Sequence, residues 1–165
     1  MKKFIPIASI ILFFALPLWS YAHNGELKGK YTKEKTIKKE FEVNSNALMS
    51  IDNSYGNLNI TSWNENRIMI EVRIKTNGNN EDKVQKKLDE ISVDFESGRD
   101  MVSAKTIFNQ NNTNWNWNWG GSNNVNMQID YYIKVPVKNN VHLNNDYGSI
   151  ILDRIDGHAK INCDY

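Results

Sequence analysis

A short motif occurs three times in the chain, as IDNSYGNLNI (residues 51–60), LNNDYGSIIL (residues 143–152) and INCDY (residues 161–165). Apolar residues occupy equivalent places in the copies, and each copy has a Tyr after a small polar residue. Such a unit predicts two short strands around an Asn/Asp/Gly corner, where Gly permits a positive φ and the Tyr ring stacks on its neighbour in the next layer. The predicted corner residues are Tyr55, Gly56, Tyr147, Gly148 and Tyr165.

The spacing of the motif predicts how its copies stack. From Tyr147 to Tyr165 is 18 residues, which suits one coil of a β-solenoid made of two or three short strands and their corners. Asp156-Gly157 would form a second corner of this coil. The alternative is a chance recurrence of Tyr-Gly in an Asn-rich β protein. The side chains expected to point inward in the coil are Ile150, Leu152, Ile155 and Ile161.

Alternation of apolar and polar residues predicts further strands. It runs through residues 68–75, 102–108 and 125–135, as in strands with one apolar, buried face and one polar face exposed to solvent. Pro136 has no N–H to donate, so the last of these strands should end there or lie at an edge. The sequence therefore predicts a mainly β fold with a β-solenoid or β-roll-like arrangement of its repeats.

Residues 80–91 depart from this alternation. Val84, Leu88 and Ile91 recur at helical spacing, and charged residues occupy the opposite face. Either Asn79 or Asn80, at the start of this segment, can cap its first turn. We expect one amphipathic helix, inserted at about 80–91 and packed on the β structure.

Together these features resemble the first part of the "putative adhesin" domain family of exported Gram-negative bacterial proteins. The resemblance rests on NSYGNLNI, the following Trp63, the strand RIMIEVRIKT, the helix and NDYGSI, and it covers about residues 37–165. It implies a right-handed β-solenoid-like domain in the periplasm or at the cell surface. Family members continue through several more coils, so it also implies a domain truncated at its C-terminus. It supplies no catalytic residue.

The N-terminus has the composition of a secretory signal peptide. Lys2 and Lys3 precede an apolar stretch, and Ser20 and Ala22 are small residues at the spacing that signal peptidase recognises. We expect residues 1–22 to be removed after Ala22, which leaves an exported chain without an integral membrane span. The alternative is an uncleaved anchor, although the apolar stretch is shorter than the roughly 20 residues that a spanning helix needs.

Charge and cysteine content narrow the function further. The chain is formally +1, and removal of the two signal-peptide lysines leaves −1, so there is no electrostatic basis for binding nucleic acid. Residues 28–39 are locally basic, and residues 23–36 are predicted to be a poorly ordered leader before the β domain at 37–165. Cys163 is the only cysteine, so no internal disulfide can form. Its alternating segment predicts a buried thiol, and the alternative is pairing with a cysteine beyond Tyr165.

Motifs for catalysis or cofactor binding are missing from the sequence. No Gly-rich phosphate loop, nucleophile elbow or His-Glu-x-x-His occurs, and the scattered histidines do not indicate a zinc site.

The one binding candidate lies in the Asn/Trp-rich loop at 109–124, where Trp115, Trp117 and Trp119 would share one face of an extended chain. These rings could stack on sugars or dock on a partner protein. Alternatively, they cover the flank of the β domain or belong to a flexible hairpin connection.

The sequence thus predicts a non-enzymatic, exported binding or structural module of the cell envelope, with no cofactor and no bound metal. Its unknown partner would be a protein or a glycan of the envelope. One alternative is a periplasmic regulatory or scaffold component with no role in adhesion. Another is a polysaccharide hydrolase, which needs carboxylates clustered on one face of the repeat.

Overall fold

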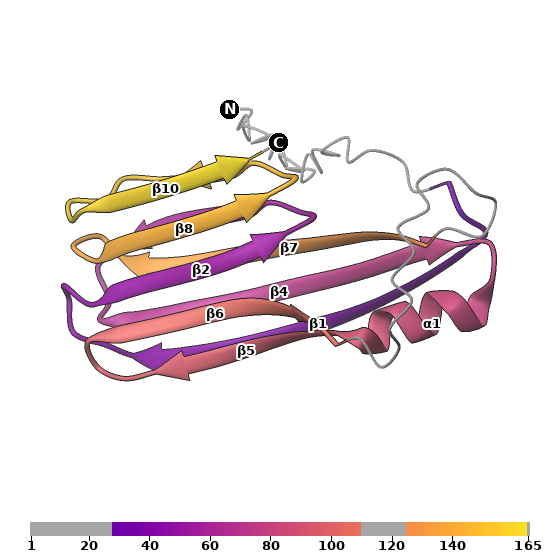
Figure 1. Ribbon diagram of the computed structural model, residues 1–165. Helices are drawn as coiled ribbons and strands as arrows, with labels where there is room; N and C mark the ends of the chain where they lie inside the picture. Colours follow the sequence, from indigo (N-terminus) through magenta and orange to yellow (C-terminus); the bar gives the residue numbers. More distant parts are fainter. Residues whose placement is uncertain (1–27, 110–124, 165) are drawn as a thin grey trace, which may run out of the picture.

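Two five-stranded sheets form the framework of the protein (Figure 1). The computed structural model describes residues 28–109 and 125–164. The strands of sheet A are β1 (Tyr31–Glu42), β3 (Leu58–Trp63), β4 (Arg67–Gly78), β7 (Asn126–Pro136) and β9 (Ile150–Leu152). Those of sheet B are β2 (Leu48–Ser54), β5 (Ile91–Ser97), β6 (Met101–Phe108), β8 (Asn140–Asp146) and β10 (Ala159–Asp164). The order is β1-β4-β7-β3-β9 in sheet A and β10-β8-β2-β6-β5 in sheet B.

The core lies between the two sheets, because each inner strand turns its apolar face toward the other sheet. In β4 the alternation predicted from the sequence is confirmed, since its four isoleucine and valine residues between 68 and 74 are fully buried. Met49, Ile51 and Leu143 fill the core from sheet B. Burial of one such side chain stabilises the fold by roughly 1.5–3 kcal/mol, so the packed sheets are the main source of stability.

The predicted helix is present as α1 (Glu81–Glu90), which packs against β4 and β1. Asn80 caps it by accepting a hydrogen bond from the Lys83 N–H at 2.9 Å. Val84 and Leu88 are its buried residues. Ile91 begins β5 directly, so the mainly β class with one inserted helix is confirmed.

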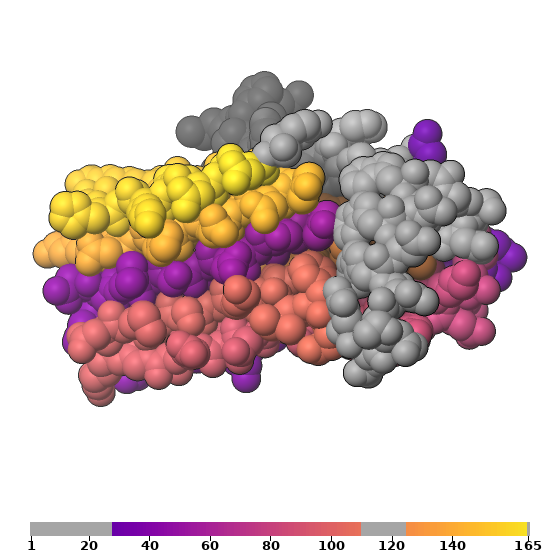
Figure 2. All heavy atoms as spheres, viewed as in Figure 1, coloured from indigo at the N-terminus to yellow at the C-terminus, as the bar shows by residue number. Residues whose placement is uncertain are grey.

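The copies of the motif lie side by side in parallel register. In sheet B, Ile51 of β2 pairs with Leu143 of β8, which pairs with Ile161 of β10. In sheet A, Leu58 of β3 pairs with Ile150 of β9. Figure 2 shows the strands of sheet B as successive bands, from β10 in yellow through β8 and β2 to β6 and β5. Equivalent motif positions therefore form columns that run across each sheet.

Both sheets are mixed, which departs from a solenoid built of parallel coils throughout. The pairs β1–β4, β4–β7 and β5–β6 are antiparallel. Strands β1, β4 and β5 form these antiparallel pairs, and together with α1 they lie on one side of the stacked repeats (Figure 1). The fold is therefore two mixed sheets around one core.

The structure also changes two boundaries expected from the sequence. β1 begins at Tyr31, so residues 31–36 of the predicted leader are strand, because they pair with β4 and their charges are matched by Glu81 and Lys75. The segment 109–126 does not connect the two strands of a hairpin, since β6 lies in sheet B and β7 lies in sheet A. The predicted signal peptide, residues 1–22, lies outside the described residues.

Candidate interaction surface

The two motif corners use Tyr and Gly differently from the prediction. Tyr55 and Tyr147 have φ values of 67° and 59°, so the Tyr takes the left-handed conformation that was expected of the Gly. The Gly is needed for close approach instead. A Cβ on Gly56 would lie 2.0 Å from the Ile129 carbonyl oxygen, and one on Gly148 would lie 1.8 Å from the Gly56 carbonyl oxygen. Each corner thus packs its glycine directly on the backbone of the neighbouring layer.

The tyrosines of the corners form a stack. The rings of Tyr55 and Tyr147 lie 5.2 Å apart and are nearly parallel, at 7°, while Phe108 meets Tyr55 edge-on at 5.9 Å. Burial raises the pKa of Tyr55, and the neighbouring Tyr147 raises it further. Tyr147 is exposed and forms the outer ring of the stack. Tyr165, the third predicted corner residue, lies outside the described residues.

A column of buried polar side chains runs beside the corners. Asn53 accepts a hydrogen bond from Thr106 Oγ1 at 2.8 Å and donates through Nδ2 to Asn145 Oδ1 at 3.0 Å. Asn145 in turn donates to the Gly56 carbonyl oxygen at 2.9 Å. This Asn ladder, formed by Asn53 and Asn145, was not predicted from the sequence, although Asn occupies the same motif position in the first two copies.

Cys163 occupies that motif position in the third copy. Its Sγ donates to the Gly148 carbonyl oxygen at 3.2 Å. The thiol is exposed, so the prediction of a buried thiol is wrong. The reason is that β10 is at the edge of sheet B and all six of its residues are exposed.

The outer face of sheet A, which points away from the core, carries exposed aromatic and cationic side chains. Arg73 lies over the ring of Tyr132, with its Cζ 4.5 Å from the ring centroid. Asn59 of β3 pairs with Tyr132 of β7 on one side and with Ile151 of β9 on the other, so these three residues form a row across the sheet. Tyr132 is 39% exposed and Ile151 is 60% exposed, which makes this row accessible to a partner.

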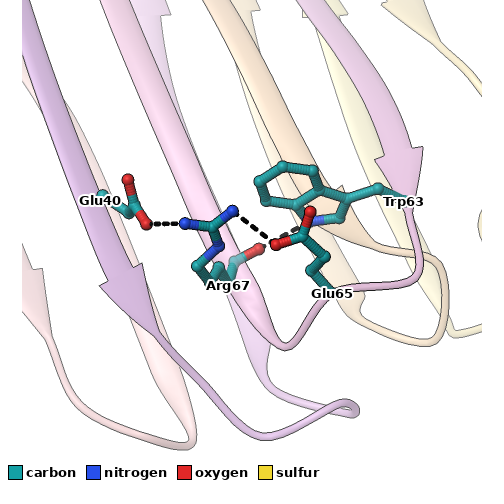
Figure 3. Close-up of polar contacts among 4 residues, drawn as sticks. All are labelled: Glu40, Trp63, Glu65 and Arg67. Carbon is teal, nitrogen blue, oxygen red and sulfur yellow. Dashed lines mark hydrogen bonds and ion pairs between the residues drawn. The ribbon is translucent and has the colours of Figure 1, made fainter.

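A second aromatic ring, that of Trp63, lies at one end of this face (Figure 3). The Arg67 guanidinium lies 5.0 Å from the Trp63 ring and the Lys134 ammonium 5.4 Å from it. Trp63 Nε1 donates to the Arg67 carbonyl oxygen at 2.8 Å, which fixes the ring. Arg67 is held between the carboxylates of Glu65 and Glu40, whose hydrogen bonds raise its pKa.

Ion pairs fix the charges elsewhere on the outer face of sheet A. Glu71 accepts hydrogen bonds from Lys38 at 2.9 Å and from Arg73 at 2.7 Å, and these bonds lower the pKa of Glu71. Exposed pairs of this kind add at most about 1 kcal/mol each to stability. Their effect here is to hold Arg73 in place over Tyr132.

The three tryptophans of the predicted binding loop, Trp115, Trp117 and Trp119, lie outside the described residues. We expect that replacing all three by Ala leaves the fold intact and shifts the thermal midpoint by less than about 3 °C. The check is a thermal melt followed by circular dichroism, with the wild-type chain measured beside the variant. A collapse of the midpoint would show that the rings are part of the core and would end their candidacy as a binding site.

Neither a metal centre nor a membrane helix is seen in the part of the chain that the structure describes. Within residues 28–109 and 125–164, no three His, Cys, Asp or Glu side chains are grouped so that they could hold a metal ion. No helix in the same ranges is both long and apolar enough to cross a bilayer.

Comparison with known proteins gives two solved structures. One is a putative cell adhesion protein from Clostridium sporogenes, with 15% identity, a TM-score of 0.42 and 80% of this chain covered. The other is a putative adhesin from Bacteroides fragilis, with 12% identity, a TM-score of 0.30 and 76% of this chain covered. The matches span 59% and 55% of those two chains. Both are described as putative adhesion proteins. No protein-family model and no curated protein matches the sequence.

Proposed function

We propose that the chain is an exported module of the cell envelope that acts by binding, and that the outer face of sheet A is its binding surface. The observation that carries this proposal is the pair of aromatic rings, Trp63 and Tyr132, each with a cationic side chain beside it. Aromatic and Arg side chains supply most of the binding energy in protein interfaces, and cations beside rings are attracted to them. The exposed Met69 and Ile151 on the same face add apolar contact area.

The carboxylates of this face favour binding over hydrolysis. A glycosidase needs two carboxyl groups in different protonation states, one of them with a raised pKa. Here Glu40 and Glu65 are both bound to Arg67, and the pKa of Glu71 is lowered by its cationic neighbours. Glu71 is therefore held as the ionised partner of Lys38 and Arg73, and Glu40 and Glu65 are engaged by Arg67, which suits a fixed recognition surface.

The finer architecture and the location of the protein belong to the same proposal. We take β8 and β9 as one solenoid coil and β10 as the start of the next, supported by the pairing of Ala159 with Val141, 18 residues earlier. The N-terminal pattern of Lys2, Lys3 and the apolar stretch supports export. Added protease distinguishes the two compartments, because a surface protein is digested in intact cells and a periplasmic one is protected.

The binding surface is tested with the double variant Arg73→Ala/Tyr132→Ala. We expect it to bind isolated cell envelopes at least about tenfold more weakly than the wild type, a loss of about 1.4 kcal/mol or more. The measurement is co-sedimentation of the purified protein with envelopes over a range of concentrations. Envelopes stripped of protein or of glycan then show which class of partner is bound.

The matched control is Lys105→Ala. Lys105 is an exposed cation on sheet B that is paired with Asp52 at 2.9 Å, as Arg73 is paired with Glu71. It should leave envelope binding unchanged. Equal binding by the double variant and the wild type would refute the assignment of the surface.

A further inference from the structure

One cation on the outer face of sheet A has no carboxylate partner among the described residues. This cation is Lys134, which is exposed in β7, the middle strand of the sheet. Its neighbours in the register are Met69 of β4 and Thr61 of β3, and both are uncharged. The other cations of this face each form an ion pair with a carboxylate; they are Lys38, Arg67, Arg73 and Lys75.

Aromatic rings flank Lys134 along β7. Tyr132 lies two residues before it on the same side of the strand. Trp63 of β3 pairs with Pro136, two residues after it. Trp63 Nε1 donates to the carbonyl oxygen of Arg67 on β4, and β7 lies between β3 and β4 in the sheet. The indole ring therefore lies across β7 at Pro136, so the order along β7 is ring, cation, ring.

The spacing of this row matches the spacing of an extended chain. Alternate residues of a strand lie about 6.6 Å apart, so the row spans about 13 Å from Tyr132 to Pro136. A second strand that lies along β7 presents its own alternate side chains at the same interval. Sheets that pack face to face keep their strands within about 30° of each other. Three alternate side chains of such a strand therefore meet the ring, the cation and the ring in turn.

We infer that this row is a docking site for a β-strand of a partner protein, which places an acidic side chain at Lys134 and an apolar side chain at each ring. The inference rests on the proposed function, because it names the partner of the same face. The carboxylate supplies the counter-charge that Lys134 lacks, and charge-assisted hydrogen bonds are about twice as strong as neutral ones. Met69, which is 37% exposed beside Lys134, adds apolar contact with the docked strand.

The cations of this face favour a protein strand over a sugar chain. A sugar stacks on the flat face of an aromatic ring, but Arg73 lies over Tyr132, and Arg67 and Lys134 lie over Trp63. These cations occupy ring surface that stacking needs, whereas apolar side chains can pack on the ring edges and on the aliphatic stems of the cations. Because the other cations already have carboxylate partners, the site takes one anionic group and does not suit a polyanion.

Peptides of defined sequence test the site. The probe is a cyclised β-hairpin that presents Phe, Glu and Phe at alternate positions of one strand, since a pre-organised strand loses less entropy on binding. In an NMR titration of the full chain, we expect the wild type to bind this hairpin at least about fivefold more tightly than the same hairpin with Gln in place of Glu. Lys134→Ala should bind the two hairpins equally, and Lys134→Glu should prefer a hairpin with Lys at the centre. No binding by the wild type, or equal binding of its Glu and Gln hairpins, would overturn the inference.

Lys75→Ala is the matched control for Lys134→Ala. Lys75 is a cation of the same face that lies outside the row and is paired with Glu34 at 3.4 Å. Its removal should leave the preference for the Glu hairpin unchanged. Loss of the preference in Lys75→Ala as well would show that the general charge of the face, and not Lys134, selects the ligand, and would refute the inference.

Isolated envelopes separate this inference from the proposed function. Lys134→Ala should weaken envelope binding, Lys134→Arg should retain it, and amidation of the envelope carboxyl groups should weaken binding of the wild type to a similar extent. Binding that survives removal of the envelope proteins would refute the protein strand as the ligand. Wild-type binding by Lys134→Ala, together with weak binding by Arg73→Ala/Tyr132→Ala, would refute the docking site and leave the proposed function standing.

Discussion

Gly56→Ala should destabilise the protein by about 3 kcal/mol or more, toward the upper end of overpacking effects. The added Cβ would lie 2.0 Å from the oxygen of Ile129 and 2.4 Å from its carbonyl carbon. Both are backbone atoms, so no side-chain rotation can relieve the contact. To accommodate the methyl group, β7 and the corner must separate, which breaks the hydrogen bond from the Ile129 N–H to the Tyr55 carbonyl oxygen at 2.9 Å. Urea unfolding followed by circular dichroism measures the loss.

Gly98→Ala is the control for this substitution. The nearest atom to its added Cβ is the Met101 carbonyl oxygen at 3.9 Å, an ordinary contact distance, and the residue is exposed. We expect a change within about 0.5 kcal/mol, as at other exposed sites. If both variants lost the same stability, the close packing of the corner would not be the cause.

The sequence predicts local structure in this protein better than it predicts strand partners. The helix and the alternating strands follow from periodicities within a few residues, and both are present as α1 and β4. The partition into two sheets depends on contacts between distant segments. β6 and β7 are consecutive strands, yet they pair with β2 and β3 in different sheets. Nothing in the intervening sequence distinguishes that arrangement from a hairpin.

At the Tyr-Gly corner, prediction from the sequence has the same limit for a single residue. The recurrence of Tyr-Gly identifies the corner, because a chain reversal with a small residue repeats at equivalent places. It does not show which of the two residues takes the positive φ. The second residue is Gly for another reason, because the carbonyl oxygens of Ile129 and Gly56 in the next layer leave no room for a Cβ there. Tyr55 and Tyr147 take the left-handed conformation, and their stacking helps to offset its cost.

The candidate binding surface could not be predicted from the sequence for a related reason. Trp63 and Tyr132 are far apart in the chain and lie on one face only because β3 and β7 pair in parallel with a defined register. The tryptophans that drew attention in the sequence are close together and recur in a simple pattern. Sequence reasoning favours such local clusters, whereas a sheet face is assembled from single residues of several strands.

Asn53→Ala should be the second strongly destabilising substitution, with a loss of about 3 kcal/mol from unsatisfied partners and a new cavity. Asn53 is fully buried and donates to the Ile129 carbonyl oxygen at 3.1 Å as well as to Asn145. Without it, Thr106 Oγ1 loses its acceptor at 2.8 Å and keeps the Tyr131 hydroxyl as a partner. Burial raises the pKa of Tyr131, so this phenol stays protonated and cannot take over as a charged acceptor.

Two further variants show whether the Asn ladder acts as a unit. Asn144→Ala is the control, because Asn144 is the neighbour of Asn145 on the outer side of β8, where its side chain donates a long hydrogen bond to Asp52 Oδ1 at 3.3 Å. It should cost less than about 1 kcal/mol. The double variant Asn53→Ala/Asn145→Ala should lose less than the sum of the two single losses, since each single change already breaks the bond between them. Additive losses in urea unfolding would mean that the two amides stabilise their layers independently. The hydrogen bond between Asn53 and Asn145 would then not couple the stability of one repeat to that of the next.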